Sequence, residues 1–249
     1  MREKYQSDGV KRVYLFQLIG LSVLSTGVQL LAGSQVLSAA TGLPFEIVTV
    51  LLAVIALSYS VISGIKASML TDAIQMVFML VASISFLIVA VRSVGGEGIA
   101  AGINGISGTY TSFWSKEGID VFLSFGLPTA VGLLSGPFGD QSFWQRAFAV
   151  KKSRIGHAFL LGAILFGVVP FSMGILGFAG AGIGYQAQDL GVINFELIKA
   201  LMPAWAVLPF LYMIISGLLS TVDSNLCAVS SLVTDISGGK VLKRTKWAM

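Results

Sequence analysis

Charged residues are scarce in this sequence. Asp, Glu, Lys and Arg make up 11% of its 249 residues, whereas a soluble domain carries about 25%. So few charges leave too little polar surface to keep a folded globule in solution. Together with the 55% hydrophobic content, this scarcity excludes a soluble domain and indicates a protein embedded in a membrane.

Cysteine and histidine are almost absent. Cys227 is the single cysteine, which excludes an internal disulfide and a cysteine metal cluster. His157 is the single histidine, which excludes a multi-histidine metal site. The sequence also offers no nucleophile–base constellation and no phosphate-binding loop, so we expect neither an enzyme nor an organic cofactor.

Long apolar runs fill most of the chain. A spanning helix needs about 20 mostly apolar residues, and six segments qualify: 13–36, 45–64, 68–92, 119–137, 156–182 and 204–236. We therefore predict an all-α membrane protein with six transmembrane helices in a single domain. The longer connections are expected at 93–118, with a short helix at 116–120, and at 185–203, with an interfacial helix at 194–201.

Basic residues are distributed unevenly over the predicted connections. If the N-terminus is cytoplasmic, 13 of the 16 basic residues fall on the cytoplasmic side, and Arg92, Lys116 and Lys199 fall outside. An excess of Lys and Arg marks cytoplasmic loops, so both termini are predicted to lie in the cytoplasm, with the spans in the plasma (cytoplasmic) membrane. The net charge of +4 then reflects topology, and we do not expect nucleic acid as a partner.

Oxygen-bearing residues line one face of the last predicted helix. Gly217, Ser220, Thr221 and Ser224 follow the i, i+3, i+4, i+7 spacing of a helix face, and Asp223 lies beside it. Hard cations prefer oxygen ligands, so this face is a candidate sodium site. Such a stripe also suits close packing with each hydroxyl bonded to its own backbone. The acid favours a functional interpretation, because an acidic residue inside a membrane costs roughly 3 kcal/mol.

A second acid, Asp72, lies near the inner end of the third predicted span. It could form an ion pair with Lys66. It could instead face the last helix and complete an oxygen cage with Ser220, Asp223 and Ser224. Two carboxylates at one place can hold a cation, or share a proton because like charges shift one pKa upward.

A cluster of glycines around a proline ends the fourth predicted span, at 132–139 (GLLSGPFG). Pro137 removes a backbone donor and the glycines loosen the chain. Non-helical backbone inside a membrane survives only where it is buried in protein or lines a cavity, and transporters bind substrates at such breaks. The cluster therefore indicates either a broken helix at a substrate site or a plain helix end before a basic loop.

Three motifs resemble the sodium:solute symporter family. They are STVDSN at 220–225 with SSLVTD at 230–235, GIKA at 64–67 with Thr71, Asp72 and Gln75, and QRAFA at 145–149. The motifs occur in family order, and the resemblance covers nearly the whole chain. It implies an inverted-repeat core of ten helices, of which the six spans look like core helices three to eight. The chain is then expected to be truncated at both ends, with the missing helices as its partners.

The resemblance also implies roles for individual residues. The family's sodium site uses a carbonyl and two hydroxyls of core helix eight, which map to Gly217, Ser220 and Thr221, with further ligands from the missing core helix one. A second cation or proton site maps to Asp72, Ser220 and Ser224, with Asp223 where a hydroxyl is usual. Substrate contacts on core helix six map to Leu133, Ser135, Pro137 and Gln141.

The function implied by the resemblance is sodium-coupled symport of a small polar solute, such as urea or an amino acid, by alternating access. Residues 140–146 (DQSFWQR) look closest to the urea and polyamine branch, while proline and pantothenate remain open. Two interpretations from other classes are a sensory or structural membrane module and an inactive fragment of a transporter gene.

Overall fold

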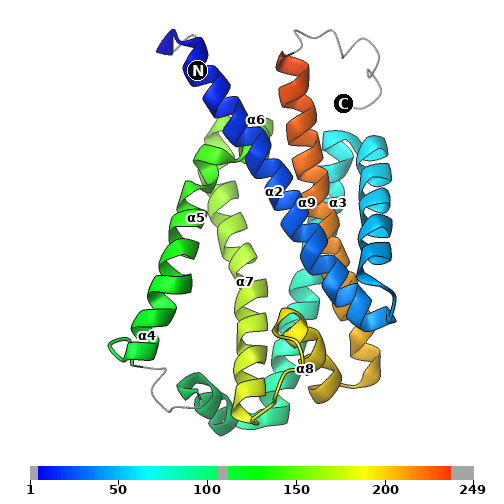
Figure 1. Cartoon of the computed structure of the whole chain (residues 1–249), viewed down its shortest axis with the longest axis vertical. Helices are drawn as coiled ribbons and strands as arrows, with labels where there is room; N and C mark the ends of the chain where they lie inside the picture. The colour runs from blue at the N-terminus through cyan, green and yellow to red at the C-terminus, as the bar shows by residue number, and fades with distance from the viewer. Residues whose placement is uncertain (1–4, 106–111, 237–249) are drawn as a thin grey trace.

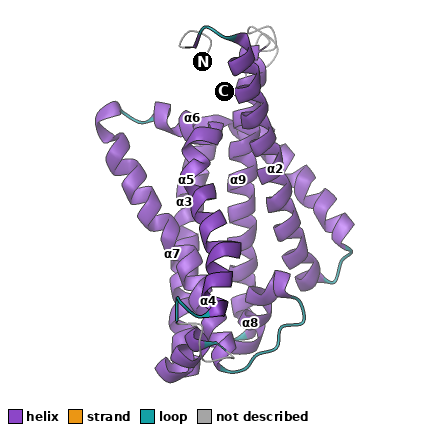
Figure 2. Cartoon of the chain, turned by 60° about the vertical axis from the view of Figure 1, so that its left-hand side comes forward, coloured by secondary structure: helices purple, strands orange, loops and turns teal. Residues whose placement is uncertain are grey.

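Helices make up nearly all of the part of the chain that the structure describes. The computed structural model describes residues 5–105 and 112–236, without the side chains of 61–67 and 235–236. Within those ranges there is no strand (Figure 2). Five helices are long and apolar enough to cross a membrane, and a shorter apolar helix covers Phe45–Ser60. The predicted all-α membrane fold is therefore confirmed.

The first long helix, α2, runs from Asp8 to Thr41. It begins there because the Ser7 hydroxyl accepts a hydrogen bond from the Val10 N–H at 3.3 Å. It ends at Gly42, which takes a left-handed φ of 73° and returns its N–H to the Ser38 carbonyl. These caps, rather than the apolar run at 13–36, set the ends of the helix.

The next helix, α3 (Phe45–Asn104), folds back on itself. The hydroxyls of Tyr59 and Thr71 form a hydrogen bond, although 12 residues of straight helix would separate them by about 18 Å. Figure 1 shows the two arms running in opposite directions. They match the predicted spans 45–64 and 68–92. The second arm, however, stays helical to Asn104, with a left-handed Gly95 inside it, so the loop predicted from residue 93 begins later.

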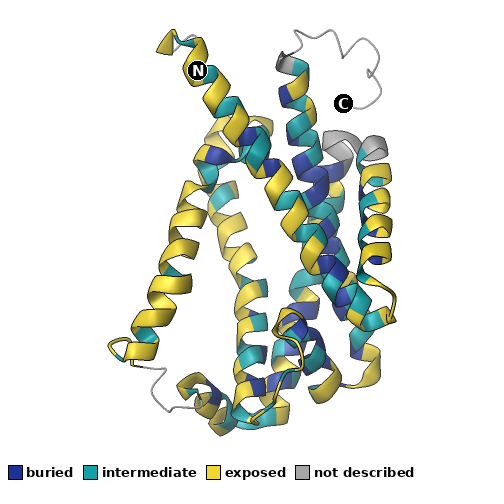
Figure 3. Ribbon diagram, viewed as in Figure 1, coloured by how far each residue is buried: buried dark blue, intermediate teal, exposed yellow. Residues whose placement is uncertain are grey.

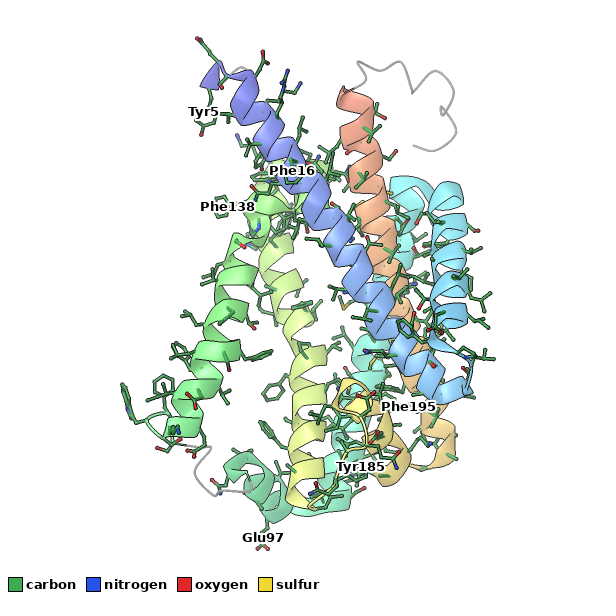
Figure 4. All side chains as sticks on the ribbon, viewed as in Figure 1. Tyr5, Phe16, Glu97, Phe138, Tyr185 and Phe195 are labelled. Atoms are coloured by element: carbon green, nitrogen blue, oxygen red, sulfur yellow. The ribbon has the colours of Figure 1, made fainter. Side chains whose placement is uncertain are left out.

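The fourth span is a rod built from three consecutive pieces: α4 (Lys116–Val121), a π-helical turn (Phe122–Gly126) and α5 (Leu127–Gly139). The rod stands apart from the other spans along most of its length (Figure 1). It meets α2 near its last turn, where the Tyr14 hydroxyl donates to the Phe138 carbonyl at 2.9 Å (Figure 4). The short helix predicted at 116–120 is thus present as α4.

The remaining helices are α6 (Gln141–Ala149), α7 (Ile155–Gly182), α8 (Ile193–Leu201) and α9 (Val207–Ile236). The helix α8 confirms a helix at the predicted 194–201, and its interfacial position stays a prediction. The N-terminal end of α2, the helix α6 and the C-terminal end of α9 lie at one end of the molecule, with α4 and α8 at the other (Figure 1). An even number of crossings between the termini produces this arrangement.

Buried apolar residues form two clusters that share α9. The larger joins the second arm of α3 to α7, α8 and α9 through Phe86, Leu176, Leu197, Ile198 and Phe210. The smaller joins the first arm of α3 to α9 through Val48, Leu52, Leu218 and Val222. Of the five long spans, α9 has the largest buried share (Figure 3). The helix with the predicted cation face is therefore central to the packing.

Backbone lies directly against backbone where the last part of α3 crosses the end of α7. A Cβ atom at Gly102 would overlap the Phe178 carbonyl, and one at Gly182 would overlap the Gly98 carbonyl. Small residues permit this approach between membrane helices, where lipid provides no hydrophobic driving force. The glycines thus fix how closely α3 and α7 pack.

Gly102→Ala and Gly182→Ala should each lower the free energy of unfolding by about 1–3 kcal/mol, because the added methyl group forces the two backbones apart. The measurement is detergent-driven unfolding of the purified protein followed by tryptophan fluorescence. Gly174→Ala is the matched control on α7, since a Cβ there meets no atom within 4 Å. Equal stability of all three variants and the unmodified protein would contradict the close approach.

Candidate cation site

Three helices meet at the guanidinium group of Arg146. This group, carried by α6, donates from Nη2 to the Oδ2 atom of Asp72 on α3 at 2.8 Å. The same nitrogen lies 2.6 Å from the hydroxyl of Ser224 on α9. Asp72 therefore lies beside the α9 face, with Arg146 between them. The alternative partner, the side chain of Lys66, lies outside the described residues.

The helix α6 holds Arg146 in position through its own polar contacts. The Asp140 carboxylate caps the start of α6 by accepting from the Ser142 N–H at 2.8 Å and the Ser142 hydroxyl at 2.7 Å. The Gln145 amide donates to the Ser231 hydroxyl at 2.7 Å and to the Cys227 carbonyl at 3.3 Å. Two consecutive side chains of α6 thus bind α9, at positions two helical turns apart.

The predicted sodium ligands lie on one face of α9, on which Gly217, Ser220 and Thr221 are half-buried and Ser224 is buried. The Thr221 hydroxyl donates to the Gly217 carbonyl at 3.0 Å, and the Ser224 hydroxyl donates to the Ser220 carbonyl at 2.7 Å. Gly217 lines a cavity of about 400 Å³ formed with α2, α3 and α7. Hydroxyl bonds to the preceding turn also suit a packing role, so cation binding at this face stays a prediction.

Asp223 is enclosed by the protein, with 1% of its surface exposed. It directly precedes Ser224, the residue of α9 that Arg146 contacts, so a second acidic side chain lies on α9 beside the Asp72–Arg146 pair. Two residues after Asp223, the Asn225 amide donates to the Thr26 hydroxyl of α2 at 3.1 Å. Polar contacts therefore connect α9 to α2, α3 and α6 around the predicted site.

The predicted substrate residues lie away from the α9 face. α5 stays helical through Pro137 and ends at Gly139, so of the two interpretations of 132–139 the structure shows the plain helix end and not the broken helix. The irregular backbone lies on either side, in the π-helical turn and at the extended Asp140. Leu133 and Ser135 are exposed in this chain. None of the predicted substrate residues lines the 400 Å³ cavity, and their role stays a prediction: Leu133, Ser135, Pro137 and Gln141.

Sequence reasoning missed Arg146 as the partner of Asp72. The two residues are 74 positions apart, and no local spacing connects them. A usable signal existed nonetheless, because an acid at the end of a predicted span needs a cationic partner and Arg146 follows the fourth span at the same predicted side of the membrane. That signal would have made Arg146, like Lys66, a candidate partner for the Asp72 carboxylate.

Comparison with known proteins identifies the family. The model of the sodium:solute symporter family matches residues 1–244. The chain belongs to the sodium:solute symporter family. This family membership makes it an integral membrane protein of a transporter family rather than an enzyme, as its motifs predict.

Named relatives of this chain include urea and pantothenate transporters. It is 27% identical to a urea-proton symporter of Oryza sativa, over 89% of this chain and 35% of that protein. It is 23% identical to the sodium/pantothenate symporter of Escherichia coli, over 92% of this chain and 48% of that protein. A probable urea active transporter of Schizosaccharomyces pombe is 25% identical to it, over 94% of this chain and 39% of that protein.

The chain matches less than half the length of each of these relatives. No solved structure matches it significantly. The matched segment therefore shows the family, whereas the activity of a whole transporter depends on more than this segment.

Gln145→Leu and Ser231→Ala should be coupled in a double-mutant cycle of unfolding free energy. We expect a coupling of about 0.6 kcal/mol, the average for hydrogen bonds between membrane helices. Detergent-driven unfolding of the four proteins provides the measurement. Ser230→Ala is the matched control, because Ser230 is exposed on the adjacent position of α9 and should show no coupling to Gln145→Leu. Equal coupling for Ser230 and Ser231 would refute the contact.

Proposed function

We propose that the protein performs sodium-coupled symport of a small polar solute across the cytoplasmic membrane by alternating access. The observation that supports the proposal is the surroundings of the α9 oxygen face, where Gly217 lines the 400 Å³ cavity and Ser224 contacts Arg146. Membership of the sodium:solute symporter family supports sodium as the coupling ion. The shared end of the molecule at which the described termini lie is taken as the cytoplasmic side.

Gly217, Ser220 and Thr221 are the proposed sodium ligands. The Thr221 hydroxyl donates its proton to the Gly217 carbonyl, which leaves the hydroxyl lone pairs for an ion. The carbonyl, which also accepts within the helix, becomes a ligand in our proposal when the ion displaces that hydroxyl bond. Hard cations of similar size hold oxygens at about 2.4 Å, and two such ligands can be neighbours when they lie 3.0 Å apart, as these do. The hydrogen bond already present therefore brings two ligands together without an ion.

Further helices outside this sequence complete the site in our proposal. Three oxygens on one helix make half of a coordination shell, because a hard cation takes about six to eight oxygen ligands in proteins. The same helices would cover α5, whose side chains are exposed along most of its length. Leu133, Ser135, Pro137 and Gln141 would then contact the solute between α5 and its new neighbours.

The solute is proposed to be urea or a small polar organic acid such as pantothenate, following the relatives. Their names also differ in the coupling ion, since one is a urea-proton symporter and another a sodium/pantothenate symporter. Our proposal commits to sodium, because the ligands in question are two hydroxyls and a carbonyl, and none of these exchanges a proton near neutral pH.

Replacing both hydroxyls, as Ser220→Ala with Thr221→Ala, should reduce sodium-stimulated uptake at least tenfold, since the ion loses two of its three ligands on α9. The measurement is uptake of labelled urea and labelled pantothenate into proteoliposomes that contain the protein expressed from its native gene. Uptake of each solute is measured once with a sodium gradient and once with a pH gradient as the driving force. Ser85→Ala is the control, because Ser85 makes the same type of bond to its preceding turn on an exposed face of α3.

Three outcomes decide the proposal. A loss confined to the double variant supports sodium binding at α9. Unchanged sodium stimulation in the double variant removes the assignment of these ligands. Uptake that responds to the pH gradient and ignores sodium in the unmodified protein replaces sodium with a proton as the coupling ion.

A further inference from the structure

The helix α6 presents two aromatic rings on the side away from its polar contacts. Gln145 and Arg146 reach α9 and α3, whereas Trp144 and Phe148 are 38% and 85% exposed. Residues four positions apart share a helix face, and the two rings lie 6.3 Å apart at an angle of 33°. α6 is therefore amphipathic, with a polar face toward the bundle and an aromatic face away from it.

Ring contacts to α7 hold the aromatic face in place. The Phe143 ring packs against Phe159 of α7 with centroids 4.5 Å apart, and against Trp144 at 6.3 Å. α6 lies at one end of the bundle, next to the start of the α7 span (Figure 1). An amphipathic helix at the end of a span suits the headgroup region of a bilayer, where aromatic side chains are favoured. The exposed rings are therefore suited to the boundary between water and lipid.

Three exposed basic residues follow α6 directly. Lys151, Lys152 and Arg154 lie on a short turn before α7, and the Arg154 N–H donates to the Lys151 carbonyl at 2.8 Å. In the part of the chain that the structure describes, no acidic side chain forms an ion pair with any of them. The turn thus holds three positive charges within four residues, beside the aromatic face of α6.

The carboxylates near this turn do not neutralise it. The sequence contains no Asp or Glu between Asp140 and Asp189. Asp140 accepts from the N–H and the hydroxyl of Ser142. Asp72 is already in an ion pair, and Asp223 is enclosed by the protein. The positive charge of the turn is consequently available to a partner outside the chain.

An anion with an apolar body fits this combination of charges and rings. Each basic residue near an anionic bilayer contributes a roughly fivefold preference for it. A small soluble anion such as inorganic phosphate would meet the charges but leave both aromatic rings in water. A phospholipid satisfies both parts, because its phosphate meets the basic side chains while its glycerol and upper acyl groups cover the rings.

We propose that the turn between α6 and α7 binds the headgroup of an anionic phospholipid. Lys151, Lys152 and Arg154 hold the phosphate, and Trp144 and Phe148 contact the glycerol and the first acyl carbons. The bound lipid fixes the aromatic face of α6 at the membrane surface, while the opposite face keeps its polar contacts to α9. This lipid site does not depend on the identity of the coupling ion or of the solute.

The test measures lipid preference at Trp144 in the protein expressed from its native gene, with every other tryptophan replaced by phenylalanine, including Trp114, Trp205 and Trp247. The protein is reconstituted into phosphatidylcholine vesicles that contain brominated phosphatidylglycerol or, at the same fraction, brominated phosphatidylcholine. Bromine quenches tryptophan fluorescence on contact, so the ratio of the two quenching constants reports the local preference. We expect a ratio of at least about three at low salt, falling toward about one at roughly 1 M salt, where charges are screened within about 3 Å.

Replacing the three basic residues of the turn together, as Lys151→Gln, Lys152→Gln and Arg154→Gln, should bring the ratio to about one, because the phosphate loses its partners. A matched control removes three other exposed basic side chains, all on the predicted outer side of the membrane: Arg92→Gln, Lys116→Gln and Lys199→Gln. This control changes the net charge by the same amount and should leave the ratio at Trp144 unchanged.

A ratio of about one in the protein with native basic residues, or an equal loss in both triple variants, would overturn the site. A preference that persists at high salt would overturn it as well, and this measurement decides even if the turn variant does not fold. Loss of the preference on adding soluble inorganic phosphate at constant ionic strength would identify a site for a free anion instead. A protein that keeps only Trp205, which is 68% exposed, should show no preference, and an equal ratio there would reject a local site.

Discussion

The contact between Arg146 and Asp72 holds together the end of the helix bundle at which α6 lies. A carboxylate at the edge of a membrane is unfavourable unless a positive group or hydrogen-bond donors accompany it. Arg146 supplies both, and its bond to Ser224 extends the pair to a third helix. Because α3, α6 and α9 satisfy one another there, a change in any of them must be accommodated by the other two.

Different interactions hold the helices together at the two ends of the bundle. At the end with α6, polar side chains connect the helices, and each contact depends on a charge or a hydrogen bond. At the opposite end, Gly98, Gly102 and Gly182 bring the backbones of α3 and α7 into direct contact. That backbone contact involves no polar side chain. Such a molecule is expected to respond to ions mainly at the α6 end, since packing of glycine against backbone is insensitive to charge.

Burial along the spans divides them into a packed group and a peripheral rod. Apolar side chains of α3, α7, α8 and α9 form a common core, whereas the rod of α4 and α5 contacts its neighbours mainly near Gly139. The boundary between them is Asp140, an extended residue that also caps α6. The helix that holds Arg146 is therefore connected to the rod through a single non-helical residue, so a movement of the rod would act directly on the position of the guanidinium.

The sequence by itself determined the membrane setting, the positions of the spans, the helices α4 and α8, and the family, because apolar runs of about 20 residues and local motifs are properties of neighbouring residues. It also placed Gly217, Ser220, Thr221 and Ser224 on one face, since helical spacing fixes that. Only the tertiary structure decided that Gly217 lines a cavity, that α5 stays helical through Pro137, and that Asp72 is paired with Arg146. Those facts depend on which helices become neighbours, and residues 74 positions apart meet through packing and charge compensation, which no local pattern encodes.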